Sequence, residues 1–154
     1  MRIKKRLNKT RVFIALTILI LLMDRITKFF ALNIKDSIPI INNVFHLTLS
    51  KNTGGGFSLF QGQKIFLIII SIIVIIAILY YYNKVSKKFN IAFAFVLAGT
   101  LGNLIDRLYF SYVIDFIDLR IWPIFNIADI SLTIGAIILI YRVIFFKEKN
   151  VKTK

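Results

Sequence analysis

The sequence contains no cysteine and only one histidine, His46, among its 154 residues. Without cysteine the chain can form neither a disulfide framework nor a thiol nucleophile, and it offers no thiol for lipidation. A single histidine also argues against a zinc site and against a catalytic triad built on histidine. Any chemistry must therefore use other side chains, and we expect neither a metal nor another cofactor.

Acidic residues are also scarce, with seven Asp and Glu against 21 Lys and Arg and a formal net charge of +14. A strongly basic chain can indicate nucleic-acid binding. Here, however, 58% of the residues are hydrophobic, and the basic residues flank long apolar runs, where membrane topology requires them. We therefore expect a membrane protein with no nucleic-acid partner.

Four apolar runs are long enough to cross about 30 Å of hydrocarbon at about 1.5 Å per residue. The first run follows a basic N-terminus but is too long for a signal peptide and lacks a small-residue cleavage site, so we interpret it as an uncleaved span. The sequence predicts an all-α membrane protein in which residues 1–154 form a single domain. Its four transmembrane helices cover about 12–32, 64–82, 90–110 and 124–146.

The distribution of Lys and Arg predicts the orientation of these spans. Basic residues concentrate before the first span, in 83–89 and after residue 146, whereas 33–63 and 111–123 together hold only three. By the positive-inside rule both termini are cytoplasmic, and the two basic-poor loops face outward. The alternating stretch "FHLTLS" at 45–50 predicts a strand, so we expect a small β-containing extracytoplasmic flap between spans one and two.

Three of the six aspartates, Asp24, Asp106 and Asp129, fall within apolar runs. An ionisable group costs about 2.5–3.5 kcal/mol at the centre of a membrane helix, so each indicates a functional site. Helical rise places Asp106 about 6 Å and Asp129 about 8 Å below the outer ends of their spans. Asp115 lies in the loop that joins those spans, so these acids should gather near one level under the outer face.

Asp115 and Asp129 are 14 residues apart, far enough for the chain to fold back and bring them together. Two adjacent carboxylates share a proton, so the charged one activates water while the neutral one protonates the leaving group, as in aspartic proteases. Asn126 shares a helical face with Asp129. A transporter or channel is a rival interpretation, but transport sites lie near the midplane. These acids cluster near one face, and the run 64–82 offers no polar path.

Helical spacing predicts partners for the other acids. Asp24 and Lys28 are at i, i+4, so we expect them to pair while Lys28 reaches the outer interface. Arg107 follows Asp106 directly and should neutralise it. Asn103 lies on the same helical face as Asp106. These residues are expected to support the site rather than to carry the chemistry.

Four segments resemble those of the bacterial lipoprotein signal peptidases, the signal peptidase II family of four-span aspartic peptidases. They occur in the family's order, and the length and topology fit the whole chain. Arg25 stands where the family commonly has Gln, and Gly55 and Gly56 replace small residues such as Ala. The segments are "DRITK" at 24–28, "NTGGGFS" at 52–58, "GTLGNLIDRLYFSYVIDFIDL" at 99–119 and "FNIADISLTIG" at 125–135.

The resemblance implies that Asp115 and Asp129 form the catalytic pair, with Asp106 open as an alternative second acid. We prefer Asp115, because Asp106 has an arginine beside it and can be held ionised in an ion pair. The resemblance further implies that nine residues line or support the site and help to hold the substrate: Asp24, Lys28, Asn52, Gly54, Asn103, Asp106, Arg107, Asn126 and Ala128.

The implied substrate is a prolipoprotein that carries a diacylglyceryl cysteine, and the implied reaction is removal of the signal peptide by cleavage before that cysteine. The resemblance places the enzyme in the bacterial cytoplasmic (inner) membrane, in contact with lipid, with its active site near the extracytoplasmic face. A monomer is expected, and globomycin is the expected inhibitor.

Overall fold

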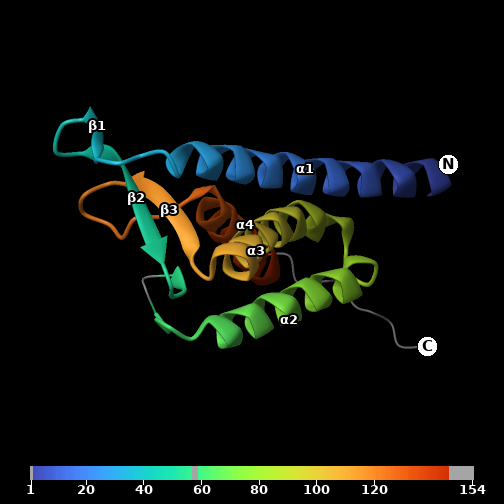
Figure 1. Cartoon of the computed structure of the whole chain (residues 1–154). Helices are drawn as coiled ribbons and strands as arrows, with labels where there is room; N and C mark the ends of the chain where they lie inside the picture. Colours follow the sequence, from blue (N-terminus) through green and yellow to red (C-terminus); the bar gives the residue numbers. More distant parts are fainter. Residues whose placement is uncertain (1, 57–58, 146–154) are drawn as a thin grey trace.

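The computed structural model describes residues 2–56 and 59–145. Within these ranges the chain forms four α-helices, a short 3-10 helix before the third α-helix, and one small antiparallel sheet (Figure 1). In chain order the elements are α1 (Arg2–Ala31), β1 (Ile38–Ile41), β2 (Phe45–Asn52), α2 (Lys64–Tyr82), η2 (Lys87–Phe89), α3 (Asn90–Phe110), β3 (Val113–Asp118) and α4 (Ile127–Phe145).

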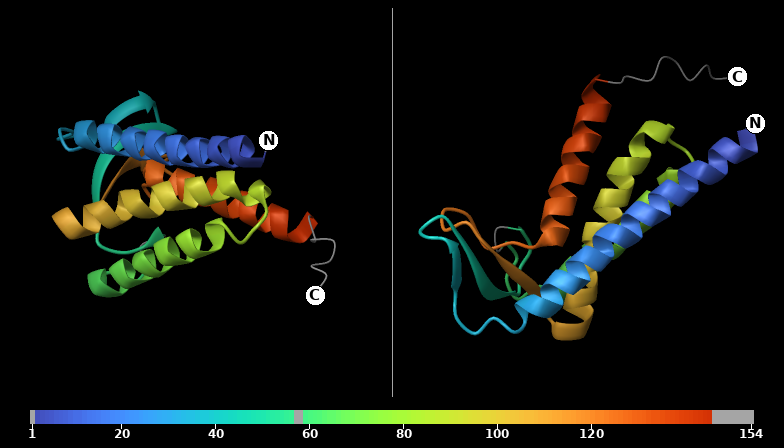
Figure 2. Two further views of the ribbon diagram at one scale, coloured as in Figure 1. Left: turned by 90° about the vertical axis from the view of Figure 1, so that its right-hand side faces the viewer. Right: turned by 90° about the horizontal axis from the view of Figure 1, so that it is seen from above.

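Helix α3 lies at the centre and contacts each of the other three helices (Figures 1 and 2). Among the residues that the structure describes, three helical segments are long and apolar enough to cross a membrane: Lys64–Tyr82, Lys87–Phe110 and Ile127–Phe145. Helix α1 is long as well, but its apolar part contains the charged residues Asp24, Arg25 and Lys28. The predicted spans 64–82 and 90–110 coincide with α2 and α3.

Small residues bring α3 and α4 close together. A Cβ atom on Gly99 would lie 2.4 Å from the carbonyl oxygen of Ala128, and one on Gly135 would lie 2.6 Å from Cγ2 of Val96. Ser131 donates a hydrogen bond to the Phe95 carbonyl oxygen at 2.7 Å. Such small-residue contacts are typical of helix pairs in membranes, and here they hold the polar ends of α3 and α4 against each other.

The sheet has the order β1, β2, β3, with both pairs antiparallel. It lies at the end of the molecule where α1 and α3 finish and α4 begins (Figure 1). Ser50 of β2 is the Cα partner of Asp115 in β3, and Asn52 is the partner of Val113. The predicted strand at 45–50 is therefore present, extended to Asn52. Asp115 lies, as expected, in the connection between α3 and α4, and residues 113–118 of this connection form a strand because β2 provides the pairing partner.

Helix α4 begins at Ile127 rather than at the predicted residue 124. The preceding Phe125 pairs with Ile117 instead, accepting a hydrogen bond from its backbone N–H at 2.8 Å and returning one at 3.1 Å. Asp129 therefore lies two residues inside the helix and not five. The predicted end of this span at residue 146 lies outside the described residues.

Candidate active site

Asp129 is built into the first turn of α4 by a reciprocal cap with Asn126. Oδ1 of Asn126 accepts the backbone N–H of Asp129 at 2.9 Å, and Oδ2 of Asp129 accepts the backbone N–H of Asn126 at 3.2 Å. This is the capping-box arrangement, with Asn and Asp in the two positions. A carboxylate is also stabilised at a helix N-terminus by the helix dipole. The local sequence "NIAD" therefore explains why an acid is tolerated here.

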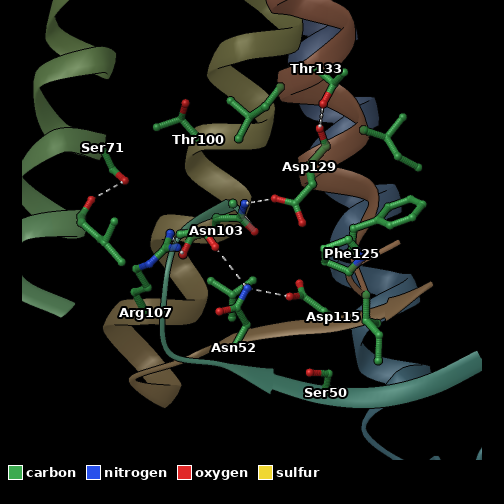
Figure 3. Close-up of a pocket in the computed structure, with 18 of the residues that line it drawn as sticks. Ser50, Asn52, Ser71, Thr100, Asn103, Arg107, Asp115, Phe125, Asp129 and Thr133 are labelled. Carbon is green, nitrogen blue, oxygen red and sulfur yellow. Dashed lines mark hydrogen bonds between the residues drawn. The ribbon is translucent and has the colours of Figure 1, made fainter. Parts of the chain in front are cut away.

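Asp115 reaches the same place from β3, where it is 1% exposed. Its Oδ1 accepts a hydrogen bond from Nδ2 of Asn126 at 2.6 Å, and its Oδ2 accepts one from Nδ2 of Asn52 at 2.9 Å. Asn126 thus contacts both Asp115 and Asp129. Figure 3 shows the two carboxylates in one pocket, with Asn52 beside Asp115 and Asn103 beside Asp129.

Asn103 of α3 connects Asp129 to the interior. Its Nδ2 donates to Oδ1 of Asp129 at 2.8 Å. Its Oδ1 accepts from Nζ of Lys28 at 3.1 Å and from Nδ2 of Asn126 at 3.3 Å. Each carboxylate oxygen of the two aspartates therefore has a hydrogen-bond donor, as buried polar groups require.

Behind Asn103 lies a cluster of four charged residues, Asp24, Arg25, Lys28 and Asp106, which we call the charge cluster. Nζ of Lys28 lies 3.1 Å from Asp24 and 2.7 Å from Asp106. The predicted Asp24 and Lys28 pair is confirmed. The expectation that Lys28 reaches the outer interface is wrong, since Lys28 is 1% exposed and turned inward. Two buried acids attract it more strongly than the interface can.

Asp106 takes its ion-pair partners from α1, Arg25 and Lys28, and not from Arg107 as expected. Neighbouring residues on an α-helix point about 100° apart, so Arg107 faces another way. Its Nη2 donates to the Gly54 carbonyl oxygen at 2.8 Å and ties the loop after β2 to α3. The Gly54 N–H donates to Oδ1 of Asn52 at 2.9 Å.

The structure brings all eleven predicted site residues into one connected network. The last of them, Ala128, donates its backbone N–H to Oδ1 of Asp24 at 3.0 Å. Sequence reasoning missed Arg25, which it treated only as a departure from the family pattern. The available signal was its position beside Asp24, inside an apolar run where an unpaired cation is costly.

Burial raises the pKa of the Asp115 carboxyl to about 7, and the nearby Asp129 carboxylate acts in the same direction. Hydrogen bonds from Asn52 and Asn126 and the charge of Lys28 oppose this rise. Asp115 can therefore hold a proton near neutral pH, where an ordinary aspartate is fully ionised. Among the described residues, no group of three or more His, Asp or Glu side chains could hold a metal ion.

A cavity of about 990 Å³ opens beside the two aspartates. One part of its wall is polar, formed by residues that include Asn52, Asn103, Arg107, Asp115 and Asp129. The other part is apolar and comes mainly from α2, α3 and α4, with Leu67, Ile70, Val74, Val96, Leu132 and Ile134. A cavity with these two sides suits an amphiphilic substrate.

Comparisons with known proteins identify the family of this chain. The family model for signal peptidase (SPase) II matches residues 16–145. The lipoprotein signal peptidase of Halothermothrix orenii is 43% identical over 128 residues, covering 80% of this chain and 88% of that protein. The lipoprotein signal peptidase of Clostridioides difficile is 39% identical over 145 residues, covering 90% of this chain and 98% of that protein.

Two solved structures, each described as a bacterial membrane enzyme determined by the in meso method, have the same fold. One, at 2.3 Å resolution, has a TM-score of 0.80 and 35% identity, and the match covers 92% of this chain and 94% of that chain. The other, at 1.9 Å, has a TM-score of 0.77 and 35% identity, and covers 90% and 94%. Together with the apolar helices, these likenesses show a multi-pass membrane protein. The chain belongs to the signal peptidase II family.

Proposed function

We propose that this chain is an aspartic endopeptidase that removes signal peptides from prolipoproteins, cleaving before a diacylglyceryl-modified cysteine. Family membership supports the substrate class and the hydrolytic reaction. One observation carries the aspartic mechanism: Asn126 binds both Asp115 and Asp129 and so holds two buried carboxyl groups beside one cavity.

In this mechanism the pair shares one proton. The ionised carboxylate removes a proton from a water molecule, whose oxygen attacks the scissile carbonyl carbon, while the protonated carboxyl donates its proton to the carbonyl oxygen. Collapse of the tetrahedral intermediate breaks the C–N bond, and the leaving amine receives a proton from the pair. Asp115, whose burial raises its pKa to about 7, is suited to hold a proton at neutral pH.

The two sides of the cavity suit the two parts of this substrate. The apolar wall of α2, α3 and α4 would contact the acyl chains, and the polar wall would contact the peptide near the scissile bond. Arg107 and Asn52 connect the loop after β2 to this wall, so that loop would help to exclude water from the reacting groups.

We propose α1 as a fourth membrane span beside the three more apolar helices. Its charged residues Asp24 and Lys28 are turned inward and paired, so they do not face lipid. Its outer surface is apolar, since Leu22, Ile26 and Phe29 are each more than half exposed. With basic flanks on the cytoplasmic side, the end that carries the sheet faces out of the cell, where a lipid-bearing cysteine of the substrate would lie.

The enzyme would act as a monomer in the bacterial cytoplasmic membrane. Purified protein should cleave a diacylated prolipoprotein, and globomycin should inhibit it. Asp115→Asn and Asp129→Asn should each lower kcat by about 10³-fold or more, because either change removes one of the two proton-transfer groups. Asp106→Asn should retain more activity than either, since Asp106 is a supporting residue in this mechanism.

Asp36→Asn is the matched control, because Asp36 is an exposed aspartate in the segment between α1 and β1. Each variant must first show wild-type thermal unfolding in detergent. Full activity of folded Asp115→Asn or Asp129→Asn, or of the wild type in saturating globomycin, would contradict the proposal.

A further inference from the structure

Each proposed catalytic aspartate follows a residue whose backbone N–H is held by the charge cluster. Ala128, which precedes Asp129, donates to Oδ1 of Asp24 at 3.0 Å. Ile114, which precedes Asp115, donates to Oδ2 of Asp106 at 3.1 Å. Ala128 and Ile114 are 0% and 1% exposed, so water cannot replace these acceptors. Asp24 and Asp106 therefore anchor the two backbone segments that carry the proposed catalytic residues.

The guanidinium of Arg25 joins these two carboxylates directly. Its Nη1 donates to Oδ1 of Asp106 at 2.6 Å, and its Nε donates to Oδ2 of Asp24 at 3.2 Å. Its Nη2 also donates to the Gly102 carbonyl oxygen at 2.8 Å, which fixes the group against α3. A planar guanidinium presents its donors in a rigid fork, so it sets the separation between the acids in a way that a flexible ammonium cannot.

Arg25 also balances the charge of the cluster. The two acids Asp24 and Asp106 are matched by Arg25 and Lys28, so the formal sum is zero. Without Arg25 the cluster would carry a net charge of −1, and Lys28 alone would neutralise two carboxylates. The net field of the cluster at the proposed catalytic pair would then be more negative.

The groups around Asp115 show why this balance matters. Lys28 from α1, Arg107 from α3 and Asp129 from α4 are the charged groups that face it. From β2 and the start of α4 it meets only the neutral amides of Asn52 and Asn126.

We propose that Arg25 is a positioning residue for the catalytic pair. It fixes the spacing of the segments that carry Asp115 and Asp129, and it keeps the net charge of the charge cluster at zero. This inference rests on the proposed function, because it assigns Arg25 a role in the reaction of that pair.

Three substitutions separate the two parts of this role. Arg25→Met removes both the planar guanidinium and its charge, so kcat should fall about tenfold or more while KM changes little. In the pH profile of kcat/KM, the fall at alkaline pH should begin about half a pH unit or more higher, because the charge cluster then carries a net negative charge that favours the protonated form of Asp115. Arg25→Gln keeps hydrogen-bonding groups without the charge, so it should retain more kcat but show the same shift. Arg25→Lys keeps the charge but loses the planar guanidinium. The alkaline fall of kcat/KM should therefore stay at its wild-type pH, while kcat falls.

Arg120→Met is the matched control. It also removes one cation, but Arg120 pairs with Asp118 and lies outside the cluster, with its side chain 47% exposed. Thermal unfolding in detergent first establishes that each variant is folded. If Arg25→Met does not fold, Arg25→Gln and Arg25→Lys still give opposite expectations for the alkaline fall of kcat/KM. The inference would be overturned if folded Arg25→Met or Arg25→Gln had the wild-type kcat and if its kcat/KM fell at the same alkaline pH as that of the wild type.

An infrared titration tests the charge effect without turnover. The band of the protonated Asp115 carboxyl, assigned by its loss in Asp115→Asn, should titrate at higher pH in Arg25→Gln than in the wild type. An identical midpoint would overturn the charge part of the inference. Failure of the proposed function would appear separately, as full activity in Asp115→Asn.

Discussion

The side-chain amide of Asn126 donates a hydrogen bond to Oδ1 of Asp115 at 2.6 Å and so joins the first turn of α4 to strand β3. The same asparagine caps α4 through its reciprocal bonds with Asp129. One residue therefore starts a helix and sets the relation between two acids that are 14 residues apart. Its two functions can be separated by substitution.

Asn126→Ala should lower both stability and activity. Loss of the helix cap costs about 1 kcal/mol or more of unfolding free energy. Loss of the amide that orients Asp115 should lower kcat about 100-fold. Asn126→Ser keeps a capping oxygen but cannot reproduce the amide donor, so it should unfold close to the wild-type temperature while kcat stays low. Wild-type kcat in either variant would contradict this role.

The raised pKa of Asp115 predicts the pH dependence of activity. In the proposed mechanism the pair needs one shared proton, and raising the pH through about 7 removes it. We expect kcat/KM of the wild type to fall about tenfold per pH unit above this value, since kcat/KM reports the free enzyme. The measurement is a pH series on a diacylated peptide in detergent micelles. A flat profile from pH 6 to 9 would show that this carboxyl does not act as described.

The same carboxyl predicts a pH dependence of stability. Its pKa lies near 3.8 in an unfolded chain and at about 7 in the folded protein, so the folded state binds more protons between these values. The contribution of Asp115 to stability is therefore greatest at low pH and declines as the pH rises from about 4 to about 7. Thermal unfolding across this range should show the decline in the wild type and a smaller one in Asp115→Asn. Identical curves for the two proteins would argue against it.

Gly102 should tolerate no side chain. A Cβ there would lie 2.7 Å from Oδ2 of Asp24 and 3.0 Å from Cβ of Ala128. Gly102→Ala must therefore displace either the charge cluster or the start of α4, with an expected loss of about 1–3 kcal/mol in stability. Gly56→Ala is the matched control, because nothing lies within 4 Å of its Cβ position. Equal unfolding temperatures for the two variants would contradict this packing.

The helices α2 and α3 could be predicted from the sequence, because an apolar run of sufficient length must cover its backbone polar groups by forming a helix in lipid. The candidate acids could be predicted for a related reason. A carboxylate in such a run has a high free-energy cost, so its presence indicates a functional role. Asp24, Asp106 and Asp129 were identified on that ground, and the structure places all three in the same network.

Features that depend on distant partners could not be predicted in this way. The strand β3 requires pairing with β2, so "VIDFID" alone looked like part of a loop. The role of Arg25 depends on Asp106 and Gly102, which lie 81 and 77 residues away in the chain. The sequence predicts Lys28 at the outer membrane interface because helical spacing identifies only Asp24 as its partner. Asp106, its second partner, comes from another helix.

The bond between Ala128 and Asp24 joins positions 104 residues apart, one near the end of α1 and the other at the start of α4. Ribosomes make the chain from its N-terminus, so the end of α1 is made before the start of α4. Until then Asp24 has no contact with the segment that carries Asp129, and Asn126 is not present to orient Asp115. The contacts that hold the two carboxyl groups beside one cavity can therefore form only after the start of α4 has been made.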